Sequence, residues 1–80
     1  MIIVISTLPG VFSEENCVLE INMTCSEWPW WKSYLSAHVF RDVLEGTYYI
    51  RGLGNDIDRK FPDLPSAKQA AIVLLQAELL

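Results

Sequence analysis

The chain has a single histidine, His38, and Asp42 follows it at the four-residue spacing that places two side chains on one face of a helix. With Cys25 upstream, a Cys-His-Asp arrangement for nucleophilic catalysis is conceivable. Such spacings are common by chance, and a chain this short has little material for a catalytic cleft beside its core. We therefore expect Asp42 to hydrogen-bond His38 in a structural role. The protein is not expected to be an enzyme, and a small enzyme using His38 is the weaker alternative.

Oxygen-bearing and basic side chains gather in and around residues 52–65. The possible cation ligands there are Asn55, Asp56, Asp58 and Asp63. The segment lacks the glycine and the terminal glutamate of a calcium-binding loop, and Gly52-Leu53-Gly54 is not followed by the helix start of a phosphate loop. We expect no metal and no cofactor. A disfavoured alternative is nucleic-acid binding through Arg51, Arg59 and Lys60.

The charge of the chain is unevenly distributed. Ten acidic and six basic residues give a formal net charge of -4. No Lys or Arg precedes Lys32, so the imbalance lies in four early glutamates: Glu14, Glu15, Glu20 and Glu27. An acidic edge of this kind repels phosphate and attracts basic protein surfaces, which argues against direct nucleic-acid binding. The alternative is that these are four ordinary solvated glutamates.

The longest element predicted to position these residues is a helix over residues 26–45, which holds all three tryptophans. Ser26 suits an N-cap, Glu27 suits the positive end of the helix dipole, and Pro29 suits the first turn. Gly46 suits a left-handed C-terminal cap. Both ends of the segment therefore carry helix signals.

Such a helix would have two apolar faces. Trp28, Trp31 and Leu35 fall on one arc, and Trp30 and Tyr34 fall on the roughly opposite arc. One arc can pack on a sheet, whereas the other needs cover from a second helix, a second copy or a partner. In the first alternative the C-terminal helix covers it. In the second, Trp30 and Tyr34 stay partly exposed as a binding anchor.

Three strands are expected. Residues 1–8 are apolar on both faces, as in a strand that is covered on both sides or central in a sheet. Residues 17–25 alternate apolar and polar side chains, which is the clearest strand pattern here, and residues 47–51 form a short third strand. The first two strands should form an antiparallel hairpin.

After a long connection over residues 52–65, a second helix is predicted over residues 66–80, with Ser66 and Gln69 spaced as a capping box. The predicted fold is α+β: a small antiparallel three-stranded sheet packed against two helices in the order ββαβα, in a single domain over residues 1–80. Cys17 and Cys25 are too far apart on one strand for a disulfide and should be buried free thiols.

No apolar run is long enough for a signal peptide or a membrane span, so we expect a soluble, cytoplasmic protein. The favoured hypothesis is a non-catalytic protein-binding inhibitor or modulator that uses Glu14, Glu15, Glu20, Glu27, Trp30 and Tyr34. Its partner would be a larger protein or a nucleic-acid-handling complex with a basic surface. A small homodimeric structural or regulatory subunit is the alternative.

A compact, acidic, motif-poor chain of this length resembles, at the level of class, the small phage inhibitors of bacterial machinery such as anti-CRISPR proteins. No motif carries the likeness, so no residue role is transferred. The resemblance implies that the acidic edge would occlude a basic groove on a nucleic-acid-handling complex.

Overall fold

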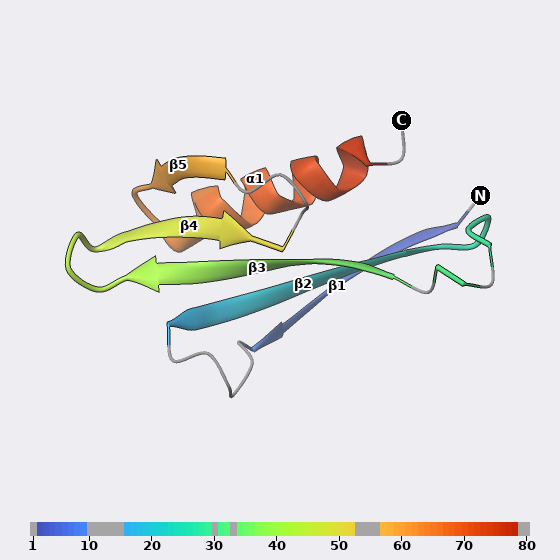
Figure 1. Ribbon diagram of the computed structural model, residues 1–80, viewed down its shortest axis with the longest axis horizontal. Helices are drawn as coiled ribbons and strands as arrows, with labels where there is room; N and C mark the ends of the chain where they lie inside the picture. Colours follow the sequence, from blue (N-terminus) through green and yellow to red (C-terminus); the bar gives the residue numbers. More distant parts are fainter. Residues whose placement is uncertain (1, 10–15, 30, 33, 53–56, 79–80) are drawn as a thin grey trace.

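A computed structural model describes residues 2–9, 16–29, 31–32, 34–52 and 57–78. Within these residues, five strands are followed by one helix (Figure 1). The elements are β1 (Ile3–Pro9), β2 (Cys17–Cys25), β3 (Leu35–Asp42), β4 (Thr47–Arg51), β5 (Ile57–Phe61) and α1 (Leu64–Ala77).

The strands form one antiparallel sheet in the order β1-β2-β3-β4-β5, so each strand pairs with its neighbour in the chain. Helix α1 packs against β2 to β5 on one face of this sheet. The predicted three-stranded sheet with two helices is therefore wrong, because the described chain has two more strands and one fewer helix than expected.

The largest error concerns residues 26–45, where the described residues form turns and strand β3 rather than a helix. Residues four apart lie on the same side of a helix and also on the same side of a strand, so the spacing of Leu35 and Val39 does not distinguish the two. The neighbouring strands decide the outcome, because β3 pairs with β2 along one edge and with β4 along the other.

The helix signals near Gly46 belong to the turn between β3 and β4. The Gly46 N–H donates to the Asp42 carbonyl at 2.7 Å, which closes a single helix-like turn. Gly46 has φ +70, the left-handed conformation that also suits a helix C-cap. The Asp42 carboxylate accepts hydrogen bonds from the N–H groups of Leu44 and Glu45. The sequence therefore indicated the correct local turn but the wrong element before it.

Strands β2 and β4 have the predicted bounds, and the antiparallel hairpin of β1 and β2 is confirmed. Strand β1 is not central or covered on both sides, however. It forms one edge of the sheet, and within it Ile5 alone is half-buried while the other residues are exposed.

The predicted connection over residues 52–65 contains strand β5, which forms the other edge of the sheet. The C-terminal helix is confirmed, but the predicted capping box is wrong because the helix begins before Ser66. Asp63 is the N-cap, and its carboxylate accepts from the Ser66 N–H at 2.8 Å. This hydrogen bond, with one from the Ser66 hydroxyl, holds the pKa of Asp63 below its ordinary value.

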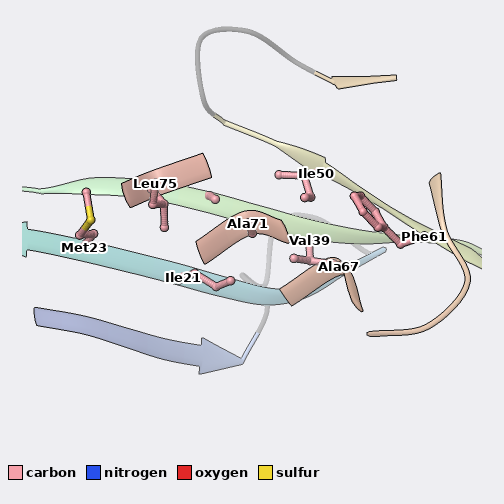
Figure 2. Packing of buried hydrophobic residues seen from close by; sticks show 9 residues of the cluster. Ile21, Met23, Val39, Ile50, Phe61, Ala67, Ala71 and Leu75 are labelled. Atoms are coloured by element: carbon pink, nitrogen blue, oxygen red, sulfur yellow. The ribbon is translucent and has the colours of Figure 1, made fainter. Parts of the chain in front are cut away.

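The hydrophobic core lies between α1 and the sheet (Figure 2). The helix presents Ala67, Ala71 and Leu75, all fully buried, and the two alanines allow a close approach to the strands. The strands contribute Ile21, Met23, Ala37, Val39, Ile50 and Phe61. The alternation predicted for β2 is thus confirmed, with Ile21 and Met23 on the core side.

Cys17 and Cys25 lie at opposite ends of β2 as free thiols, as predicted. Cys17 is buried, whereas Cys25 is only half-buried. Within the described ranges, α1 is the only helix, and it is too short to cross a bilayer.

Replacing Leu75 with alanine should destabilise the fold by about 2–5 kcal/mol, because it opens a cavity between α1 and the sheet. Urea unfolding monitored by circular dichroism measures the change. The matched control is Val73→Ala on the same helix, where the side chain is 52% exposed and the cost should stay within about 0.5 kcal/mol. Equal costs for the two variants would contradict the packing described.

Asp42 should make stability depend on pH. The Glu45 N–H and then the Lys60 ammonium hold the pKa of the Asp42 carboxyl below its ordinary value of 3.8. A lowered folded-state pKa stabilises the fold above the unfolded value, and this stabilisation disappears as the pH falls through the folded value. The urea midpoint of Asp42→Asn should therefore lie below that of the wild type at neutral pH, and the gap should close below pH 3.8. Glu78→Gln, at the end of α1, is the charge-matched control.

Candidate functional site

One end of the sheet carries a cluster of large apolar side chains, which we call the tip. It comprises Ile2 and the described residues of the connection between β2 and β3, namely 26–29, 31–32 and 34. Figure 1 shows this connection beside the N-terminal end of β1. The Ser26 N–H donates to the Ile2 carbonyl at 2.9 Å, and the Ile2 N–H donates to the Ser26 hydroxyl at 2.8 Å. The tip is thus held to the edge strand by backbone and side-chain hydrogen bonds.

Within the tip, Trp28 faces inward and supports the turn. Its half-buried side chain packs against the core. The backbone N–H of Trp28 donates to the Cys25 carbonyl. The Lys32 ammonium lies 4.7 Å from the centre of the Trp28 ring, a cation–π contact. A second turn is closed by the Lys32 N–H, which donates to the Pro29 carbonyl at 2.9 Å. These contacts hold the backbone of the tip at Ser26, Trp28 and Lys32.

Trp31 and Tyr34 project from the tip into solvent, with 69% and 57% of their surfaces exposed. Ile2, also 69% exposed, lies at the same end of the molecule because it is hydrogen-bonded to Ser26. Large aromatic side chains that remain exposed on an anchored backbone are typical of residues that bind another protein. This tip is therefore the leading candidate site.

The sequence predicted part of this site. Tyr34 was proposed as an anchor, and it is exposed. The helix prediction places Trp31 on the arc opposite Tyr34, but both residues are exposed, and Trp31 is the more exposed of the two. Pro29 could have indicated a turn here, because proline has a fixed φ and no backbone N–H. In a turn, neighbouring aromatic side chains are not restricted to the faces of a helix. Trp30 lies outside the described residues.

The predicted acidic edge is only partly within the described chain. Glu14 and Glu15 lie outside the described residues. Glu27 is exposed at the tip, whereas Glu20 lies within β2, roughly 16 Å along the strand from Cys25. Glu20 and Glu27 therefore do not form one contiguous patch.

Glu20 instead pairs with the histidine on the sheet face opposite α1, which we call the open face. The Glu20 carboxylate lies 2.9 Å from His38 Nε2, and both side chains are largely shielded, 19% and 25% exposed. The two residues are cross-strand neighbours in β2 and β3. The expected His38–Asp42 hydrogen bond is wrong, because four strand residues separate these side chains by roughly 13 Å. Cys25 lies roughly 16 Å away along β2, so the Cys-His-Asp arrangement is also absent.

Next to this pair, the open face carries an aromatic stack. The rings of Phe40 and Tyr49 lie 5.4 Å apart and nearly parallel, and the Arg51 guanidinium lies 4.8 Å from the centre of the Tyr49 ring. Arg51 is also the cross-strand neighbour of His38. The open face is thus covered by its own side chains, which pair with each other rather than forming a hollow.

A surface depression of about 500 Å³ lies between β5 and the start of α1. Its lining residues are Arg59, Phe61, Pro65, Ser66, Gln69 and Ala70. Among these described lining residues there is no carboxylate, histidine or cysteine, which are the usual general bases. Within the described part of the chain, no three such side chains gather as metal ligands.

Comparisons of the chain with known protein families, with curated proteins and with solved structures find no match. Function must therefore be inferred from the surfaces described above.

The position of Gly52 close to the His38 ring allows the packing on the open face to be tested. Gly52 has φ +102, and a Cβ there would lie 3.0 Å from His38 Nδ1 and 3.3 Å from the Ser36 carbonyl. Gly52→Ala should therefore destabilise the fold by roughly 1–3 kcal/mol more than Gly46→Ala. Gly46 is the matched control because its φ is also positive but nothing lies within 4 Å. Only Gly52→Ala should shift the His38 ring signals in an NMR spectrum; equal effects would contradict this packing.

Proposed function

We propose that this chain is a non-catalytic protein-binding module that inhibits or modulates a larger partner by docking its tip. Trp31 and Tyr34 are the anchors, and Ile2 extends the apolar contact. The single observation that carries the proposal is the exposure of two large aromatic side chains on a connection held by hydrogen bonds and by Trp28.

The physical support is that such anchors lose little conformational entropy on binding. Trp and Tyr bury a large area with few rotatable bonds, and they are enriched among residues that dominate binding energy. Where hydrogen bonds already hold the connection, at Ser26, Trp28 and Lys32, the partner does not have to order the backbone. The matching partner surface would be an apolar pocket that admits one or two aromatic rings.

The net charge of the chain favours a partner with a basic surface, although within the described tip the charges of Glu27 and Lys32 offset each other. The net charge of -4 originates from the glutamates before Lys32, and Glu27 lies in the tip itself. Opposite charge at the rim of an interface raises the association rate and suppresses wrong partners. A nucleic-acid-handling complex offers such a surface, and inhibition would follow if the docked chain occluded it.

The test is affinity capture with the tagged chain from its natural host, compared between wild type and Trp31→Ala/Tyr34→Ala. We expect a specific partner that binds the wild type and is lost, by at least about tenfold in affinity, from the double variant. Isothermal titration with the purified partner measures that ratio, and circular dichroism checks that the variant folds.

The matched control is Val43→Ala/Leu44→Ala, because these side chains are 66% and 98% exposed in the turn at the opposite end of the sheet. This variant should retain full affinity. A partner that binds both double variants as tightly as the wild type would exclude the tip as the docking surface.

A further inference from the structure

Strand β1 is an exposed apolar edge of the sheet. The sequence from Ile2, which directly precedes the strand, to Pro9 contains no charged residue. Four large apolar side chains remain exposed along it: Ile2 at 69%, Ile3 at 39%, Val4 at 53% and Leu8 at 45%. An uncharged, apolar edge strand of this length is a template for pairing with another strand.

The backbone of β1 is arranged for such pairing. The Ser26 N–H donates to the Ile2 carbonyl, and the register continues through Val4↔Thr24, so the even-numbered residues direct their backbone groups toward β2. Ile3, Ile5 and Thr7 therefore direct their N–H and C=O groups to the outer side of β1. No hydrogen bond from the described residues reaches them there. Pro9 has no N–H, so it limits the ladder at that end.

The other edge of the sheet is built differently. Strand β5 has only five residues, and Arg59 and Lys60 are exposed along it. Short, charged edge strands are protected against pairing with other chains. The two edges therefore differ as expected if β5 is protected from pairing with another chain and β1 is available for it.

We infer that β1 pairs with β1 of a second copy of this chain, antiparallel and about a two-fold axis at Ile5. In this register Ile5 faces its own copy, and Ile3 of each chain faces Thr7 of the other. Each of the three residues then both donates and accepts a backbone hydrogen bond across the interface. The two sheets become one continuous sheet, and the arrangement closes at two copies because β1 is used once in each.

The side chains are compatible with this register. On the open face, Ile2 lies opposite Leu8 of the other copy, which brings two exposed apolar side chains together. Val4 lies opposite Ser6, and no charge is brought into the contact. A second copy fits this edge because the register is self-complementary: each pair recurs on the other side of the axis, the exposed apolar ends meet each other, and no like charges are opposed.

The experiment measures mass in solution by size-exclusion chromatography with light scattering. At micromolar concentration the wild type should run at twice the 9.1 kDa of one chain. Two variants are compared with it: a lysine variant, Val4→Lys/Ser6→Lys, and a glutamate variant, Val4→Glu/Ser6→Glu. Both positions are exposed in the single chain, so the fold should be retained, as checked by circular dichroism.

Each variant alone should be monomeric, with dimer affinity reduced at least about tenfold, because like charges oppose each other across the axis. An equimolar mixture should recover the dimer, since every lysine then faces a glutamate. Leu44→Lys/Val73→Lys adds the same charge at exposed positions outside β1 and should remain dimeric.

A monomeric wild type over the whole micromolar range would overturn the inference, as would a lysine variant that stays dimeric. Assemblies larger than two copies would also contradict it. Recovery of the dimer by the mixed variants supports this particular register, because a nonspecific apolar association would not need opposite charges at positions 4 and 6. The outcome does not depend on the proposed anchors Trp31 and Tyr34, which lie outside β1 and remain unchanged in every variant.

Discussion

The packing of one helix on one face of the sheet is the contact on which the rest of this fold depends. Ala67, Ala71 and Leu75 of α1 are fully buried, and the small alanines let the helix approach strands that carry Ile21 and Val39. A chain of 80 residues buries only about 60–65% of its unfolded surface, so it has material for one such core. Every other surface must be stabilised locally or remain available for contact.

Because the chain has only one core, the remaining surfaces are covered to different degrees. The molecule measures 41 × 25 × 19 Å, and the connection that forms the tip lies at one end of it (Figure 1). Helix α1 packs on β2 to β5, so most of β1 is left exposed at the edge of the sheet. On the open face, side chains cover one another in pairs, including Glu20 with His38 and Phe40 with Tyr49. The tip and β1 lack comparable cover, since both leave large apolar side chains exposed. They are accordingly the two surfaces for which we propose binding partners.

Local signals predicted β2, β4, the first hairpin and the C-terminal helix, because each follows from a pattern within its own segment. Strand β3 could not be decided in this way. Leu35 and Val39 fit both a helix and a strand, and only the two neighbouring strands distinguish them. The candidate site shares this ambiguity. Exposure of Tyr34 is one of two alternatives that the helix prediction leaves open, whereas the inward Trp28 and the outward Trp31 depend on the turns. The Glu20–His38 pair likewise requires the register of β2 and β3.

The order of the elements has a consequence for how the chain reaches its native state. All five strands precede α1, and each pairs with the strand next to it in sequence, so the hairpins can form in succession as the polypeptide is synthesised. Until α1 emerges, Ile21, Met23 and Val39 would face water on an uncovered sheet. A nascent or prematurely terminated chain is thus the species most prone to aggregate, and timely emergence of the last fourteen-residue element protects it.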